Sequence, residues 1–299
     1  MSVGYIGLGN MGRVLAGQLL KRQALLVHDR DPRAVQLLAD QGAMPCPSPS
    51  ALAARCRTII LCLPTSAEVR DVVLGEDGIA AAAARGTIIV DQTTGDPAAI
   101  RALSPELERR GIEIVDAPVS GGIEAARAGT IAIIVGGTAA QFQRVEPTLK
   151  GISPNVFHAG ALGSGYVVKL ANNLLFAATR LLTLEVLALA AKNGVDPAKT
   201  AEILRAGSAR SLFLERVVPN ILAGQLASGF TFRLLHKDVS LATKLAHESG
   251  IPMLFGNLVR ELYQLCINEM GRDAQVNSAA LVIDRMARTH VVPERYTLE

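Results

Sequence analysis

The chain has 299 residues, of which 49% are hydrophobic and 19% are charged. This composition is typical of a folded globular protein with much buried surface and excludes an intrinsically disordered chain. The 30 basic and 27 acidic residues give a net charge of +3 and form no basic block, so we expect no nucleic-acid partner.

The first predicted element is an apolar strand from Val3 to Ile6, followed by "GLGNMG" and a helical pattern after Gly12. Three glycines at this spacing indicate a dinucleotide site only between a strand and a helix, and both elements are predicted here. Gly7 would allow the tight turn, Gly9 the approach of a pyrophosphate, and Gly12 close packing of the helix on the strand. A purely structural turn is the alternative. We expect the whole turn to bind a dinucleotide through Gly7, Leu8, Gly9, Asn10, Met11 and Gly12.

The second predicted strand, "ALLVHD", ends near Asp29, which lies 22 residues after Gly7. An acidic residue at this distance commonly binds the ribose diol of NAD, whereas the adjacent Arg30 would suit the 2′-phosphate of NADP. Because a carboxylate repels that phosphate, we expect NAD as the cofactor, with NADP as the alternative.

Four further apolar runs, "TIILCL", "GTIIVD", "IEIVDAPV" and "IAIIVGG", alternate with helical patterns up to about His158. This alternation predicts βαβ units and a mostly parallel sheet. Between them, "MPCPSPS" is a turn-rich connector whose Ser50 is placed to cap the next helix. We therefore expect an α/β domain of the Rossmann type over residues 1–162.

From Tyr166 onward the strand signals stop, which predicts an all-α domain over residues 163–299, entered by a long bridging helix over about 163–192. The run from Leu170 to Ala191 is the most membrane-like, but polar residues interrupt it. We expect a helix buried nearly all round inside protein, with no membrane partner. Ligands are expected between the two domains, at the carboxyl ends of the strands.

The four cysteines show no C-x-x-C spacing, and the N-terminus has neither the basic region nor the apolar region of a signal peptide. These features predict a reduced, cytoplasmic protein without a metal site. The histidines are expected to be structural or solvated.

Three later motifs are "DAPVSGG" (116–122), "GSGYVVKLANN" (163–173) and "HKD" (236–238). Taken singly, each has an ordinary explanation. The first suits a turn as well as an anion-binding nest. Lys169 and Asn173 share one helix face, where a lysine is usually a solvated charge. Lys237 and the aspartate after it would be a surface pair.

Together and in this order, the motifs resemble the β-hydroxyacid dehydrogenases, the group that includes 3-hydroxyisobutyrate dehydrogenase and tartronate semialdehyde reductase. The resemblance covers essentially the whole chain and also uses the "LP" of "LCLPT", "AGT" and "VGG". "DQTT" departs mildly from the family's usual D-x-S-[ST] but keeps a hydroxyl at both positions. The resemblance implies hydride transfer between a nicotinamide cofactor and a small 3-hydroxy acid or its semialdehyde.

The resemblance also assigns roles to individual residues. Lys169 would be the general acid and base, since reduction needs a proton donor for the carbonyl oxygen and oxidation needs a proton acceptor. A lysine serves both purposes where burial and nearby positive charge lower its pKa. Asn173 would hold the reacting oxygen. The substrate carboxylate would be held by Ser120, Gly121 and Gly122, and the cofactor would be lined by Leu63, Pro64, Thr94 and Lys237, the last also near the substrate.

Arg210 lies in "AGSARSLFLERVVPN" and would either pair with a second anionic group of the substrate or be a surface charge. Two other functions compete with a dehydrogenase. Imine reductases share the two-domain plan but generally lack the catalytic lysine, and a non-catalytic NAD(P)-binding sensor or scaffold would not need Lys169, Asn173 and "DAPVSGG" together. The apolar long helix and the resemblance both predict a homodimer or homotetramer through the C-terminal half.

Overall fold

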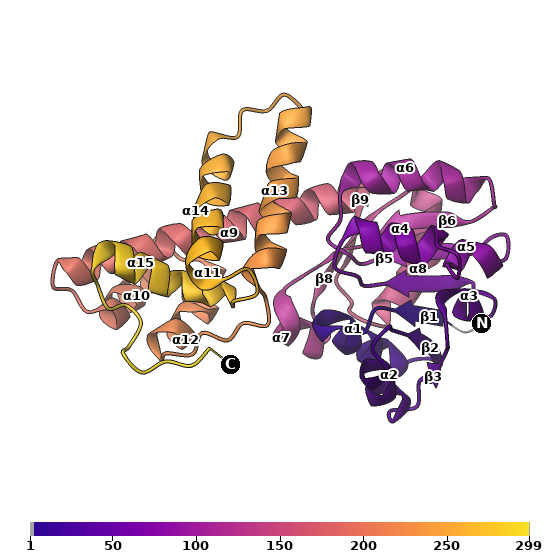
Figure 1. The fold of residues 1–299 in the computed structure, drawn as a ribbon, viewed down its shortest axis with the longest axis horizontal. Coiled ribbons are helices and arrows are strands. Elements are labelled where there is room, and N and C mark those ends of the chain that lie inside the picture. Colours follow the sequence, from indigo (N-terminus) through magenta and orange to yellow (C-terminus); the bar gives the residue numbers. More distant parts are fainter. Residues whose placement is uncertain (1–2, 299) are drawn as a thin grey trace. The chain divides into compact units, whose positions relative to one another are not determined.

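The computed structural model describes residues 3–298, and its contacts divide the chain into two compact units, Met1–Lys169 and Leu170–Glu299 (Figure 1). The first unit contains one sheet in the order β3-β2-β1-β4-β5-β6-β8-β7, with β9 paired to β8. Its strands are β1 (Val3–Ile6), β2 (Leu25–His28), β3 (Met44–Pro45), β4 (Thr58–Leu61), β5 (Ile88–Asp91), β6 (Glu113–Asp116), β7 (Val119–Ser120), β8 (Ala132–Gly136) and β9 (Val156–Gly160).

The six strands from β3 to β6 pair in parallel, as the alternating pattern predicted. Residues that alternate along a strand point to opposite faces of the sheet. Tyr5 accordingly belongs to one buried apolar cluster, and its neighbour Ile6 to another. A sheet that is apolar on both faces requires a cover of helices on both sides. The α/β fold with a Rossmann-type unit is therefore confirmed.

Eight helices connect and cover these strands in the described part of the first unit. They are α1 (Asn10–Leu20), α2 (Pro32–Ala39), α3 (Pro49–Ala53), α4 (Ser66–Leu74), α5 (Ile79–Ala82), α6 (Pro97–Glu108), α7 (Gly122–Arg127) and α8 (Ala139–Lys150). Asp and Thr side chains cap α2, α4, α6 and α8 by accepting backbone N–H bonds, as such residues commonly do. Helix α1 differs, because its N-cap is Gly9 and no side chain caps it.

Two local expectations were wrong. Helix α3 is capped by Ser48, whose hydroxyl accepts from the backbone N–H of Ala51, and Ser50 lies inside the helix. The run "IEIVDAPV" forms two strands, β6 and β7, instead of one. Pro118 lies at the break and has no N–H to give to a ladder. Strand β8 then pairs antiparallel with both pieces, which the expected parallel pattern did not include.

The second unit has helices and, over the residues described, no strand beyond two isolated β-bridges. Helix α9 (Ser164–Lys192) begins in the first unit and continues into the second, followed by α10 (Pro197–Ala206), α11 (Leu212–Arg216), α12 (Val218–Leu222), α13 (Phe232–Glu248), α14 (Leu254–Met270), the 3-10 turn Val276–Ser278 and α15 (Ala279–Ala287). Helices α13 and α14 form an antiparallel pair (Figure 1). One apolar cluster, which includes Leu184, Phe213 and Tyr263, is the core of this unit.

Helix α9 is long and apolar enough to cross a membrane by length and composition, but only 33% of its most apolar window is buried within the chain. The expectation of a helix buried nearly all round was therefore wrong for a single chain. Leu175, Leu182 and Leu189 are 70%, 53% and 64% exposed. They recur every seven residues and so form one stripe on the helix, which we call the leucine stripe. The opposite side packs into the helical core through Ala177, Leu184 and neighbouring residues.

Candidate active site

The glycine turn between β1 and α1 is shaped by two close approaches of backbone. Gly7 has a φ of +95°, and a Cβ there would lie 2.3 Å from the carbonyl oxygen of Cys62. A Cβ on Gly12 would lie 2.0 Å from the carbonyl oxygen of Gly7. Both positions therefore exclude every other residue type, as the expected tight turn and close helix packing require.

Gly9 lies between these two glycines and has a different environment. A Cβ at Gly9 would meet no atom within 4 Å, and its φ of −62° suits any residue. Neither internal packing nor backbone conformation explains a glycine at this position. Because α1 also begins here without a side-chain cap, its first N–H groups can receive an anion. The turn therefore fits the pyrophosphate of a dinucleotide.

Asp29 follows β2 and touches the glycine turn directly. Its Oδ2 accepts the backbone N–H of Leu8 at 2.5 Å, and its Oδ1 accepts the N–H of Asp31 at 2.8 Å. Leu8 is buried, whereas Arg30 is exposed. The carboxylate thus lies beside the glycine turn, at the carboxyl edge of the sheet.

The other predicted cofactor residues lie in loops that leave the same edge of the sheet. Leu63 and Pro64 follow β4, and Thr94 follows β5. The backbone N–H of Leu63 donates to Oγ1 of Thr93 at 3.1 Å, which joins the two loops. Because the carboxyl ends of parallel strands lie at one edge, the first unit brings these residues to the same side as Gly9.

The predicted carboxylate-binding residues lie at the antiparallel end of the sheet. Ser120 ends β7 and pairs with Ala132 of β8. Gly121 and Gly122 are exposed and have φ values of +136° and +76°, which place the backbone in conformations that favour glycine. Successive backbone groups in such conformations form concave sites for anions.

Lys169 lies near the start of α9 and is half-buried. Tyr166, three residues earlier, is buried, and its hydroxyl donates to Asp91 at the end of β5 at 2.5 Å. Residues three apart on a helix lie on neighbouring positions of one surface. The residue expected to exchange a proton is therefore on a helix that is bonded to the carboxyl edge of the sheet.

The second unit contains a polar cluster around a buried carboxylate, Asp238 of α13. Its Oδ2 accepts from Nδ2 of Asn173 at 2.6 Å, and its Oδ1 lies 2.9 Å from Nζ of Lys237. Asn173 and Asp238 are only 8% and 2% exposed. The interpretation of this motif taken singly, a surface pair of Lys237 and Asp238, is wrong for the aspartate, because Asp238 is buried. Its helical spacing from Leu235 and Ala242, both on the buried face, was the signal for its burial.

Arg210 does not lie in this cluster. Its side chain is 72% exposed and forms an ion pair with Glu215. Of the two interpretations left open by the sequence, the structure shows the surface charge in this conformation. An exposed ion pair of this kind adds little stability.

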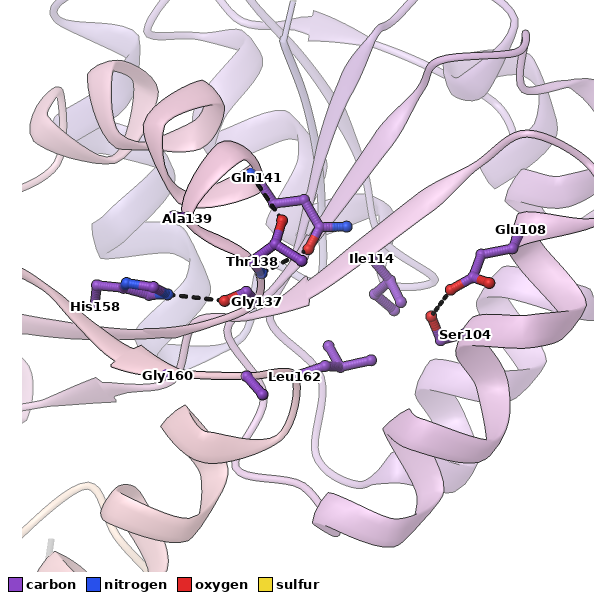
Figure 2. A pocket seen from close by; sticks show the side chains of 11 residues that line it. Ser104, Glu108, Ile114, Gly137, Thr138, Ala139, Gln141, His158, Gly160 and Leu162 are labelled. Atoms are coloured by element: carbon purple, nitrogen blue, oxygen red, sulfur yellow. Dashed lines mark hydrogen bonds between the residues drawn. The ribbon is translucent and has the colours of Figure 1, made fainter.

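A cavity of about 450 Å³ opens elsewhere in the first unit, beside the start of α8 (Figure 2). Its lining includes Glu108, Thr138 and His158 but none of the predicted site residues. The Nε2 of His158 donates to the carbonyl oxygen of Gly137 at 2.8 Å, and its ring stacks on Phe142. His158 therefore has a structural explanation. Within residues 3–298, no three His, Cys, Asp or Glu side chains lie close enough together to hold a metal ion.

Comparison with known proteins adds a second kind of evidence. Residues 2–160 match the family described as the NAD binding domain of 6-phosphogluconate dehydrogenase, and residues 163–283 match the one described as NAD-binding of NADP-dependent 3-hydroxyisobutyrate dehydrogenase. The chain is 37% identical to 3-hydroxyisobutyrate dehydrogenase of Pseudomonas aeruginosa, over 88% of this chain and 91% of that one.

The chain also resembles a second dehydrogenase and a solved structure with a bound nicotinamide cofactor. The chain is 34% identical to 2-(hydroxymethyl)glutarate dehydrogenase of Eubacterium barkeri, over 88% of each protein. A solved structure described as Psf3 in complex with NADP+ and 2-OPP has a TM-score of 0.86 and is 25% identical, over 94% of this chain and 99% of that one.

Proposed function

Since the chain belongs to the β-hydroxyacid dehydrogenase family and is an NAD(P)-dependent hydroxy acid dehydrogenase, we propose that it acts on a small 3-hydroxy acid or its semialdehyde, with Lys169 as general acid and base. One observation supports this role of Lys169. The residue lies on a helix bonded, through Tyr166, to the sheet edge that also presents the uncapped glycine turn. The proposed proton-transfer residue and the proposed cofactor turn thus belong to the same compact unit.

The chemistry assigns a separate task to each group. The bound nicotinamide supplies or accepts the hydride at the substrate carbon. In reduction, the Lys169 ammonium donates a proton to the carbonyl oxygen, and in oxidation the neutral amine removes the proton of the alcohol. Asn173 gives one N–H of Nδ2 to Asp238, and the second N–H on that nitrogen would hold the reacting oxygen. Ser120, Gly121 and Gly122 would hold the carboxylate.

The test is a panel of 3-hydroxy acids and semialdehydes, assayed with NAD and NADP by the absorbance of the reduced nicotinamide. We expect turnover of at least one 3-hydroxy acid and no turnover of its 2-hydroxy isomer. Reduction of cyclic imines without oxidation of any hydroxy acid would instead identify an imine reductase. Tight binding of the reduced cofactor without turnover of either class would identify a sensor.

A second prediction concerns which of the two nicotinamide cofactors the enzyme prefers, NAD or NADP. We expect a higher kcat/KM with NAD in the wild type, and a fall in the NAD to NADP ratio of kcat/KM in Asp29→Ala, because a carboxylate that repels the 2′-phosphate is removed. Asp29 also accepts the N–H of Leu8, so both cofactors should bind more weakly and the ratio is the informative quantity. Arg30→Ala is the matched control and should shift the ratio toward NAD. A wild type that already prefers NADP tenfold would contradict this assignment.

We further propose that the leucine stripe of α9 is covered by a second copy of the chain, in a homodimer or homotetramer. Three exposed leucines along one long helix form an apolar surface that water solvates poorly, and this pattern is typical of helix pairing between subunits. A membrane would also cover such a surface, and the test below includes that outcome. A second group of exposed apolar residues, Leu254, Phe255 and Leu258, lies on α14 of the same unit. The four free cysteines support a reducing, cytoplasmic location.

Leu182→Glu is expected to shift the protein toward a single chain, because it places a charge in the middle of the stripe. Light scattering at micromolar concentration measures the change in mass. Leu37→Glu replaces a leucine on α2 that is 47% exposed and should leave the assembly unchanged. A wild type that is already a single chain without detergent would contradict the proposal, and one that is recovered only with lipid or detergent would favour a membrane contact.

A further inference from the structure

Two carboxylates that the proposed chemistry does not use lie side by side inside the first unit. Asp91 ends β5 and Asp116 ends β6, and the two residues are paired in the register of the sheet. They are 1% and 0% exposed. Burying two like charges together is costly unless donors compensate each of them. The hydrogen-bond donors to each carboxylate therefore show which parts of the fold the two acids hold together.

The donors to Asp116 come from the start of α9. Its Oδ1 accepts the backbone N–H of Gly163, and its Oδ2 accepts that of Tyr166, both at 2.7 Å. N–H groups at the start of a helix have no carbonyl acceptor within that helix. Asp116 thus caps the start of α9, although it lies at the end of a strand 47 residues earlier in the chain. It bonds α9 to the sheet.

Two glycines leave space for this carboxylate. A Cβ on Gly165 would lie 2.8 Å from Oδ2 of Asp116 and 2.2 Å from the carbonyl oxygen of Ile134, and one on Gly136 would lie 2.3 Å from Oδ1 of Asp116. A larger residue in place of Gly165 would push α9 away from the sheet, and one in place of Gly136 would displace the Asp116 carboxylate. The glycines of "VGG" and "GSG" are therefore parts of one joint between β8, β6 and α9.

Asp91 extends the joint to the cofactor loops. Its Oδ2 accepts from the Tyr166 hydroxyl, and its Oδ1 accepts the backbone N–H of Thr93 at 3.0 Å. Oγ1 of Thr93 in turn accepts the N–H of Leu63. The Tyr166 ring also packs on Gly95, where a Cβ would lie 2.7 Å from it. An unbroken chain of contacts therefore runs from the start of α9 to the loops after β4 and β5.

Burial sets the protonation of this joint. It raises the pKa of Tyr166 well above its usual value, so the hydroxyl keeps its proton and remains a donor to Asp91. Burial also raises the pKa of Asp91 and of Asp116, and the hydrogen bonds from Tyr166, Thr93 and Gly163 oppose that rise. Removing either carboxylate would leave buried N–H or O–H donors without acceptors, which costs more free energy than a hydrogen bond contributes on average.

We propose that Asp116 and Asp91 are positioning residues for proton transfer: together they fix the start of α9, and with it Lys169, against the loops that line the cofactor. Lys169 follows Tyr166 by less than one helical turn, so a shift of the joint moves the amine by a similar amount. The proposal rests on the proposed role of Lys169 and adds the groups that hold it in place. A misplacement of about 1 Å at a reacting group costs up to ~10²-fold in rate.

The test compares Asp116→Asn, Gly165→Ala and Tyr166→Phe with the wild type. We expect Asp116→Asn and Gly165→Ala to lower kcat at least ~10-fold while the Kd of the cofactor changes less than about twofold, with a smaller fall for Tyr166→Phe, which loses a single hydrogen bond. The primary deuterium isotope effect on kcat/KM should rise, because chemistry becomes slower relative to binding. A merely structural role would lower Tm without moving either kinetic quantity.

Asp284→Asn is the matched control. Asp284 is another buried carboxylate, in the second unit, and accepts from Thr289, Val291 and Val292. Its loss should lower Tm comparably and leave kcat within about twofold. If Asp116→Asn and Gly165→Ala behave in the same way as this control, positioning is overturned. If Asp116→Asn does not fold, a Tyr166→Phe enzyme with unchanged kcat and isotope effect overturns it equally.

Lys169→Ala is measured alongside these variants and separates the two proposals. Retained turnover in Lys169→Ala would show that the proposed function of the lysine is wrong, whatever Asp116 does. Lost turnover in Lys169→Ala with full turnover in the Asp116 and Gly165 variants would show that only the positioning role is wrong.

Discussion

Replacing Lys169 by alanine is expected to lower kcat at least ~10²-fold, the lower end of the effect of removing a general acid and base. The fold and the Kd of the cofactor should be preserved, because the glycine turn and the buried contacts of Tyr166 do not involve the lysine side chain. The measurement is steady-state oxidation and reduction from about pH 6 to 10, together with cofactor binding by fluorescence of the reduced nicotinamide.

Lys192→Ala is the control for this experiment. Lys192 lies in the last turn of the same helix, where its Nζ donates to the carbonyl oxygen of Arg288. Its removal takes away the same charge and the same side-chain length without touching the start of α9. We expect kcat within about twofold of wild type, as is usual for surface changes. Near-normal activity of Lys169→Ala at any pH in the range would contradict the mechanism.

Substitutions at Gly9 and Gly12 are expected to fail in opposite ways, although both belong to "GLGNMG". Gly9→Val should leave Tm nearly unchanged, because there is open space around the position, yet raise the Kd of the cofactor at least ~10-fold, or about 1.4 kcal/mol. The added side chain would occupy the space through which a pyrophosphate approaches the start of α1.

Gly12→Ala should instead destabilise the first unit by about 1–3 kcal/mol, as overpacking does, because its Cβ would lie 2.0 Å from the carbonyl oxygen of Gly7. Thermal unfolding and cofactor titration, run on both variants, separate the two effects. Weak cofactor binding in Gly12→Ala at full stability, or lost stability in Gly9→Val, would show that the assignment of the two glycines is reversed.

Much of the first unit could be predicted from local patterns. The strands β1, β2, β4, β5 and β8 were expected from apolar runs. A strand that is buried on both faces needs apolar residues at nearly every position, and such a run is visible in the sequence. The glycine turn was predictable because positive φ and close backbone approach both exclude side chains, and that exclusion is visible in the sequence itself. The long helix was expected over about 163–192 and runs over Ser164–Lys192.

Pairings between distant segments were not predictable in the same way. The antiparallel pairing of β8 with β6 and β7 depends on where the chain returns to the sheet, which no local pattern encodes. The burial of Asp238 had a local signal in its helical spacing, but its bond to Asn173 did not, because the two residues lie 65 positions apart in the chain. Asp116 was noted only as the first letter of "DAPVSGG", since its two donors lie 47 and 50 residues further along the chain.

The sequence by itself determined the order of the main elements and the cofactor class, because each depends on residues close together in the chain or on a family motif. The same motif is the basis for proposing Lys169 as the proton-transfer residue. Only the tertiary structure decided which polar side chains are buried together and which apolar ones remain exposed. Hydrogen bonds and burial depend on distances in space, and these are set by packing across the whole unit. The Asp91–Asp116 joint and the leucine stripe are therefore properties of the folded chain.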